Sequence, residues 1–353
     1  MPDGGTTRDI TIRGLLIPAV LLSACAHAAG GWRQLPSLPD SEGFAGSFAG
    51  VSNGVLLVAG GANFPKGRPW EGGTKAWYDT VFALETPKGQ WKVAGRLRRP
   101  MGYGVSVTHY DSLICVGGAD AMRHYADACR LEWKDSRLVT TDLPPLPTPV
   151  ANACGALVGD TLYVVGGIDK PDAVRTSKST YQIDLAAPKP AWRQIEPCPG
   201  TGRMLAVAAA FDGAMWVAGG VDLIAGADGR TSRRYLSDSY RYKRGSGWTR
   251  VADLPHPVAA APSPAPSDPS GFLILGNDDG SQIATSPDRH PGFDKTILRY
   301  DARFDRWRQE GQTPAPRVTT SCVPWNGSWV VPSGEARPGV RSPEVWSFTP
   351  TKE

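Results

Sequence analysis

A short glycine motif recurs six times along this chain and limits the folds that the chain can adopt. Each copy follows an apolar run and is a Gly-Gly step or a remnant of one, and successive copies begin 57, 49, 53, 57 and 57 residues apart. The six copies are Gly60-Gly61, Gly117-Gly118, Gly166-Gly167, Gly219-Gly220, Gly276-Asn277 and Ser333-Gly334. A repeat of this period predicts that the 353 residues form one array of similar units rather than an ordinary single domain.

Each unit carries the signals of four short strands. In the third unit an apolar run, 155–158, meets a turn, and a second run, 161–165, ends at the Gly-Gly step. We expect a third strand around Tyr181 and a fourth that holds Trp192. The same Tyr-then-Trp order recurs as Tyr78/Trp91, Tyr240/Trp248 and Tyr300/Trp307. Four antiparallel strands per unit, repeated radially, predict an all-β fold of the β-propeller type.

This pattern resembles the kelch repeat over residues 32–350, which implies a six-bladed kelch-type propeller. A Trp-bearing strand, 32–36, precedes the first glycine step, and none follows the apolar run 345–348 of the sixth unit. We therefore expect the N-terminal strand to pair with the last blade and close the ring, which removes an exposed sheet edge. Residues 29–353 are predicted to form this single domain.

Residues 1–28 are predicted to be an export signal. Two arginines precede the apolar stretch 15–24, which is too short to span a bilayer as a mature helix. Ala26-His27-Ala28 fits a signal-peptidase site, whereas Leu22-Ser23-Ala24-Cys25 fits a bacterial lipobox in which Cys25 becomes lipidated. Both alternatives place the domain in the periplasm, and the second anchors it to a membrane through Cys25.

Composition excludes some partners and leaves others open. The formal charge of +4 is small for the length and is not gathered into a basic run, which argues against nucleic acid as a partner. There is no CxxC pair or Cys/His cluster, so we expect no metal site. An exported compartment permits a disulfide, but the odd number of cysteines after Cys25 assigns none, and the oligomeric state stays open.

The residue after the glycine step marks the last unit as different. In chain order this residue is Ala62, Ala119, Ile168, Val221, Asp278 and Glu335. A carboxylate at the axial wall is partly removed from water and suits the role of proton acceptor. Arg341 returns six residues later across a Pro-Gly turn, and arginine is suited to bind a carboxylate, which predicts an acidic ligand. The alternative is an ion pair between Glu335 and Arg341 or Arg337 that only braces the loop.

The segment from Gly334 to Arg341 resembles a loop of the N-acetylneuraminate epimerase (sialic acid mutarotase) family of kelch propellers. The segments 43–50, 59–64, 71–75 and 103–106 support this resemblance. It implies that Glu335 is the proton acceptor and that Arg341 assists. Weaker candidates for binding the carboxylate, acetamido or glycerol groups of the sugar are Asn63, Arg99, Tyr103 and Arg203. In the family the Glu-bearing blade precedes the blade that opens this chain, so the chain looks like a circular permutant.

The activity implied is that of an isomerase which interconverts the α and β anomers of N-acetylneuraminate, a small acidic sugar. Ring opening and reclosure need a base and an acid, and they require no metal or other cofactor. The identity of the acid and the exact sugar stay open. The alternative is a non-catalytic kelch propeller that binds a glycan or a protein through the same face.

Overall fold

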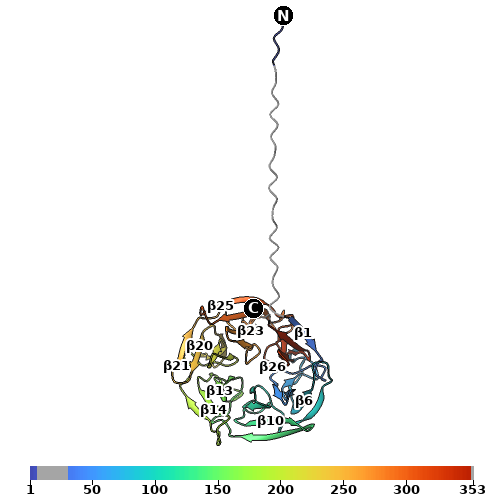
Figure 1. The fold of residues 1–353 in the computed structure, drawn as a ribbon, viewed down its shortest axis with the longest axis vertical. Coiled ribbons are helices and arrows are strands. Elements are labelled where there is room, and N and C mark those ends of the chain that lie inside the picture. The colour runs from blue at the N-terminus through green and yellow to red at the C-terminus, as the bar shows by residue number, and fades with distance from the viewer. Residues whose placement is uncertain (6–30, 351–353) are drawn as a thin grey trace.

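Six four-stranded antiparallel sheets surround one axis in the computed structural model, which describes residues 1–5 and 31–350 (Figure 1). The predicted all-β, six-bladed propeller is therefore confirmed. The apolar part of the predicted export signal, with Cys25, lies outside the described residues. Among the residues described, no helix has the length and apolarity needed to cross a membrane.

The first three blades follow one another directly along the chain. Blade 1 consists of β2 (Phe48–Ser52), β3 (Val55–Ala59), β6 (Thr80–Leu84) and β7 (Lys92–Arg96). Blade 2 consists of β8 (Val105–His109), β9 (Ser112–Val116), β10 (Ala128–Lys134) and β11 (Arg137–Leu143). Blade 3 consists of β12 (Cys154–Val158), β13 (Thr161–Val165), β14 (Thr180–Asp184) and β15 (Arg193–Ile195).

The last three blades complete the ring. Blade 4 consists of β16 (Val207–Phe211), β17 (Ala214–Ala218), β20 (Ser239–Lys243) and β21 (Gly247–Val251). Blade 5 consists of β22 (Ser267–Asp268), β23 (Gly271–Asn277), β24 (Asp294–Asp301) and β25 (Arg306–Gln312). Blade 6 consists of β26 (Val323–Trp325), β27 (Ser328–Pro332), β30 (Val345–Thr349) and β1 (Gly31–Leu35).

Three blades carry an extra two-stranded hairpin after their glycine step. These are β4 (Ala62–Asn63) with β5 (Ala76–Trp77), β18 (Val221–Ala225) with β19 (Thr231–Tyr235), and β28 (Glu335–Arg337) with β29 (Val340–Arg341). A 3-10 turn, η1 (Pro69–Glu71), lies inside the first of these loops. The segments that the sequence singled out for function are thus small structured excursions from the blades.

The hydrophobic core lies between neighbouring blades. The second strands β3, β9, β13 and β17 are buried at every residue, because each has another sheet on both faces. This explains why these strands are continuous apolar runs rather than alternating ones. One cluster joins Trp216 of blade 4 to Phe272 and Tyr300 of blade 5, so packing of large side chains links successive sheets.

The glycine steps hold successive blades together. Gly166 has φ +72°, and a Cβ on it would lie 2.2 Å from the carbonyl oxygen of Arg203, at the start of the next blade. The same carbonyl accepts a hydrogen bond from the Gly167 N–H at 2.8 Å. A side chain at Gly166 would therefore clash and would strain the backbone as well. In the sixth copy Ser333 takes the first position, and its hydroxyl accepts a hydrogen bond from the Phe44 N–H of blade 1 at 2.7 Å.

Tryptophans add a second inter-blade contact at the outer rim. The indole N–H of Trp192 donates to the Pro144 carbonyl at 2.8 Å, and that of Trp248 donates to the Glu196 carbonyl at 3.0 Å. One part of the strand prediction is corrected here. Trp192 lies just before β15 rather than within it. Trp91 likewise lies just before β7, and Tyr78 lies before β6.

The ring closes as the sequence predicted. Strand β1 pairs with β30 along its whole length, with Trp32 opposite Phe348 and their ring centroids 4.9 Å apart. Figure 1 shows β1, in blue, beside the red C-terminal strands. The last blade is thus built from both ends of the domain, and blade 6 lies directly beside blade 1.

All five cysteines among the described residues are free. Burial raises the pKa of Cys154 to about 12 and that of Cys198 to about 11, so both thiols stay protonated near neutral pH. Cys115 and Cys129 lie directly opposite each other on β9 and β10. The structure contains no disulfide among these residues. The disulfide that an exported compartment would permit stays a prediction.

Candidate active site

One backbone position repeats around the axis, and it explains where Glu335 lies. In every blade the residue after the glycine step forms an antiparallel bridge with a residue that precedes the first strand of the same blade. The bridges are Ala45 with Ala62, Gly102 with Ala119, Ala151 with Ile168, Met204 with Val221, Ala259 with Asp278, and Val318 with Glu335. Glu335 therefore occupies the same place in blade 6 that small or apolar residues occupy in blades 1 to 4.

A closed ring of backbone hydrogen bonds surrounds the axis beside these bridges. Each blade donates one N–H to a carbonyl of the preceding blade, and the N···O distances run from 2.6 to 2.8 Å. The six residues are Gly46, Tyr103, Asn152, Leu205, Ala260 and Thr319, and all have positive φ. Left-handed backbone is strained for residues other than glycine, so the surrounding structure must impose it. Tyr103 is the aromatic member of the ring.

The hairpin β28–β29 brings Glu335 and Arg341 together. The two residues are opposite each other in the register of the hairpin, and Oε1 of Glu335 lies 3.1 Å from Nη1 of Arg341. The same oxygen accepts a hydrogen bond from the Gly339 N–H at the turn, at 2.8 Å. The side chains are 17% and 4% exposed. Glu335 is thus held by the turn as well as by the arginine, and it keeps Oε2 for another partner.

Arg341 is buried with hydrogen-bonding capacity to spare. Its guanidinium carbon lies 4.7 Å from the centroid of the Phe64 ring, and its Nη2 lies 3.5 Å from the hydroxyl of Tyr103. Nε and Nη1 have no hydrogen-bond acceptor among the described residues, and the ion pair of Nη1 with Glu335 does not have hydrogen-bond geometry. Buried donors without partners are costly, so this side chain is suited to an anionic ligand.

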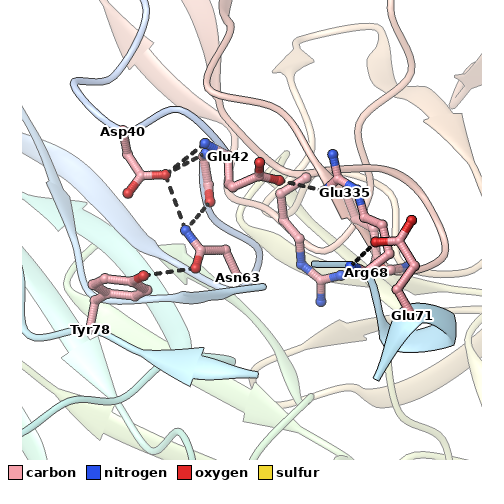
Figure 2. Close-up of polar contacts among 10 residues, drawn as sticks. Asp40, Glu42, Asn63, Arg68, Glu71, Tyr78 and Glu335 are labelled. Carbon is pink, nitrogen blue, oxygen red and sulfur yellow. Dashed lines mark hydrogen bonds and ion pairs between the residues drawn. The ribbon is translucent and has the colours of Figure 1, made fainter. Parts of the chain in front are cut away.

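The loop of blade 1 that holds η1 covers one side of this pair. Pro69 and Trp70 lie against Gly339 at the tip of the β28–β29 hairpin. The loop is itself tied down, because Arg68 forms an ion pair with Glu42 and its N–H donates to Glu71 at 2.8 Å (Figure 2). At the end of the loop, Lys75 Nζ lies 3.4 Å from the Tyr103 hydroxyl. Blades 1, 2 and 6 therefore build one wall of the site together.

These side chains line a cavity of about 620 Å³ at the axial end of the propeller. All six blades contribute to its lining. The polar and charged residues among them are Lys75, Tyr103, Asn152, Thr231, Arg233, Asp278, Thr319, Glu335 and Arg341. A concave site with a few convergent polar groups on a partly apolar wall is the usual form of a small-molecule binding site. No group of His, Cys, Asp and Glu suited to hold a metal ion occurs in the described part of the chain.

The structure brings Glu335, Arg341 and Tyr103 together, but it places Asn63 away from the cavity. Asn63 is fully buried, and its amide nitrogen donates to Asp40 at 3.1 Å and to the Gly43 carbonyl at 3.0 Å. Its amide oxygen accepts from the Tyr78 hydroxyl at 2.9 Å, as Figure 2 shows. The amide is satisfied by the protein, so Asn63 supports the entry to the η1 loop and is not among the residues that line the cavity.

Arg99 and Arg203 also lie outside the cavity. Arg203 is fully buried between blades, where Nη2 lies 2.8 Å from Asp238 and Nη1 donates to the Gly219 carbonyl at 2.9 Å. Arg99 forms an ion pair with Asp127 at 3.2 Å. Both arginines contact protein carboxylates, which gives them structural roles in this fold.

These contacts predict different effects for the two arginines. Arg203→Met leaves the Asp238 carboxylate with the Tyr240 hydroxyl but without its charged partner, and it is expected to destabilise the fold by about 3 kcal/mol. Arg99→Met removes a pair whose side chains are 34% and 50% exposed, so its expected effect is below about 1 kcal/mol. Urea unfolding of both variants measures this difference. A fully stable Arg203→Met protein would contradict the structural role.

The predicted site residues did not include three charged residues of the cavity, Lys75, Arg233 and Asp278. Lys75 entered the sequence analysis only as the last residue of segment 71–75. Arg233 lies on β19, in the extra hairpin of blade 4, where no sequence motif marks it. Asp278 carried a usable signal, because it breaks the same apolar pattern that singled out Glu335. Its hydroxyl partner, Tyr235, is 43 residues away and could not be recognised from the sequence.

Comparison with known proteins finds similarity over part of the chain. A family model described as N-acetylneuraminate epimerase matches residues 13–140. The proteins named N-acetylneuraminate epimerase from Salmonella enteritidis PT4 (strain P125109) and from Salmonella typhi are each 43% identical to the chain over 100 residues, which are 25% of the chain and 26% of each relative. The protein of that name from Yersinia enterocolitica serotype O:8 / biotype 1B is 38% identical over 126 residues, 30% of the chain and 31% of the relative.

The chain thus matches only about a quarter to a third of the length of these relatives. The stretch matched by the family model contains Asn63, Arg99 and Tyr103 and ends before Glu335 and Arg341. The family model therefore covers the part of the cavity wall that Lys75 and Tyr103 form, and it does not cover the Glu335–Arg341 pair.

Proposed function

We propose that this protein is a mutarotase that interconverts the α and β anomers of N-acetylneuraminate. The observation that carries the proposal is the pairing of Glu335 with a buried Arg341 whose Nε and Nη1 lack hydrogen-bond acceptors, at the wall of a cavity of about 620 Å³. A carboxylate beside an arginine with free donors suits an acidic substrate that must lose and regain a proton. The similarity to proteins named N-acetylneuraminate epimerase supports the choice of sugar.

The substrate carboxylate is attached to the anomeric carbon, so binding it at Arg341 places the reacting atoms beside Glu335. In the opening step Glu335 takes the proton of the anomeric hydroxyl, the bond between the anomeric carbon and the ring oxygen breaks, and the ring oxygen receives a proton. The product is the open keto acid. Rotation about the bond to the carbonyl carbon and the reverse proton transfers then close the ring with the other configuration.

Tyr103 is placed to supply the proton to the ring oxygen. Its hydroxyl oxygen lies 3.4 Å from Lys75 Nζ and 3.5 Å from Arg341 Nη2, and both groups are donors. The phenol oxygen therefore accepts, and its own O–H is left to donate to a ligand. Tyr103 also has a fixed backbone, because it belongs to the axial hydrogen-bond ring. We assign it as the proton donor for ring opening.

The proposal is tested by following the anomeric equilibration of pure α-N-acetylneuraminate with proton NMR. We expect the rate to rise in proportion to protein concentration, above the spontaneous rate in the same buffer. Heat-unfolded protein at equal concentration is the control. An unchanged rate at ample protein concentration would refute mutarotation of this sugar, and the rival interpretation of a binding propeller would then be favoured.

A further inference from the structure

A second polar group faces the same cavity from blades 4 and 5. Asp278 lines the cavity together with Arg233 of β19 and with Glu335 and Arg341 of blade 6. Asp278 holds in blade 5 the backbone position that Glu335 holds in blade 6. Two adjacent blades thus direct carboxylates to one cavity, whereas blades 1 to 4 have Ala, Ala, Ile and Val at this position.

Asp278 is held in place by contacts that fix its orientation. Oδ2 accepts a hydrogen bond from the Tyr235 hydroxyl at 2.7 Å, and Oδ1 accepts one from the Gly280 N–H at 3.0 Å. The Tyr235 ring lies against Gly280, where a Cβ would be 2.6 Å from the ring. Burial, followed by the charge of Asp278, raises the pKa of Tyr235, so the phenol keeps its proton and donates it to the carboxylate.

This arrangement has spare capacity for hydroxyl groups. A carboxylate offers about four acceptor positions, and the protein fills two of those on Asp278. Arg233 adds donors at the same side of the cavity. Apolar residues of the cavity wall, among them Ile168, Leu223 and Phe293, can cover the C–H faces of a sugar chain. Acceptor, donor and apolar wall together match a polyol and do not match a second anion.

We propose that Asp278, oriented by Tyr235 and assisted by Arg233, forms a subsite that binds the polyhydroxyl tail of the acidic sugar. This inference rests on the proposed function, because the sugar is positioned by its carboxylate at Arg341. In N-acetylneuraminate the glycerol tail is attached to the ring carbon on the other side of the ring oxygen from the anomeric carbon, and its three carbons extend away from the carboxylate. The subsite therefore contributes affinity and selects long-chain sugars, and it takes no part in the proton transfers.

The experiment compares two sugars and three variants. The sugars are N-acetylneuraminate and its seven-carbon analogue, which lacks C8 and C9 and keeps the ring, the acetamido group and the carboxylate. The variants are Asp278→Asn, Tyr235→Phe and the control Asp279→Asn. Asp279 is the adjacent acid, and its carboxylate accepts from the Ser281 N–H outside the cavity. Affinities are measured by calorimetric titration, and mutarotation of both sugars is followed by NMR.

We expect Asp278→Asn to weaken the binding of N-acetylneuraminate about tenfold or more, because a hydroxyl donor loses a charged acceptor. The seven-carbon analogue should lose less than about twofold, and kcat should stay near the wild-type value for both sugars. Tyr235→Phe keeps the ring on Gly280 and is expected to give a smaller loss with the same selectivity. Asp279→Asn should bind both sugars like the wild type.

The outcomes separate the subsite from the reaction. Equal losses for both sugars, or no loss for either, would overturn the subsite even if mutarotation is observed. A loss confined to the sugar with the full tail supports the subsite even if the wild type fails to accelerate mutarotation, in which case only the proposed function falls. If neither sugar binds the wild-type protein, both proposals are wrong.

Discussion

Glu335→Gln is expected to lower the catalysed rate of anomer exchange by about 10²- to 10⁴-fold, the usual contribution of a positioned general base. Glutamine has the same shape and keeps an oxygen that can accept from the Gly339 N–H, now at 2.8 Å from Oε1, so the β28–β29 hairpin should hold. The amide cannot take up the proton of the anomeric hydroxyl. Because Arg341 loses its only ion-pair partner among the described residues, we expect the affinity for the acidic sugar to stay the same or to increase.

The measurement combines NMR mutarotation kinetics with a binding titration of the same Glu335→Gln protein. As a control, the thermal unfolding temperatures of the wild type and the variant are compared, and equal values show that the substitution leaves the fold unchanged. A base is indicated by a loss of rate with retained affinity. A loss of affinity without a loss of catalysed rate would contradict the assigned role, and it would favour a carboxylate that only contacts the ligand.

Arg341→Lys is expected to reduce kcat/KM for N-acetylneuraminate by roughly 30- to 150-fold, which corresponds to about 2–3 kcal/mol. Lysine keeps the positive charge but cannot form the planar fork that binds a carboxylate through two parallel hydrogen bonds. The buried position makes the loss larger than at a surface site, since the side chain of Arg341 is only 4% exposed. The Arg341→Lys substitution also removes the contact between the guanidinium group and the Phe64 ring.

The methyl ester of N-acetylneuraminate distinguishes carboxylate binding from a general disturbance of the site. The ester mutarotates by the same ring opening but offers no anion to Arg341. We expect wild type and Arg341→Lys to differ by less than about threefold on the ester, because the bidentate contact is absent in both. An equal loss on the ester and on the free acid would show that Arg341 acts only by bracing the β28–β29 hairpin.

The repeat and its closure were predictable because they depend on local constraints. Gly166 belongs to a glycine step that recurs in the sequence and is recognisable there. The structure gives the physical reason for glycine, because the residue has φ +72° and a Cβ on it would lie 2.2 Å from a carbonyl oxygen. The Trp32 strand was recognisable as the missing fourth strand of the last unit, and it pairs with β30. Each of these features depends on a short segment of sequence, and the segment recurs in successive blades. Every further copy therefore strengthens the prediction of the fold.

The site was only partly predictable because partners come from distant segments. Arg203 and Arg341 both look like arginines at a loop near the axis. Asp238 and the Gly219 carbonyl accept from both terminal nitrogens of Arg203, whereas Nη1 of Arg341 has no hydrogen-bond acceptor among the described residues. Neither fact follows from spacing. Glu335 was found because it breaks an apolar pattern. Asp278 breaks the same pattern, but its hydrogen bond with Tyr235, 43 residues away, does not follow from the sequence.

Closure by the N-terminal strand has a consequence for the order of folding. Strand β1 at residues 31–35 pairs with β30 at residues 345–349, so this contact joins the most distant parts of the domain. Contacts of large sequence separation form late, because the entropy of closing the chain must be overcome first. During synthesis, five blades can assemble while β1 still has no partner. Tyr103 is then already in place, whereas Glu335 arrives with the last blade. The cavity is therefore complete only in the finished ring, and the proposed reaction requires the whole ring.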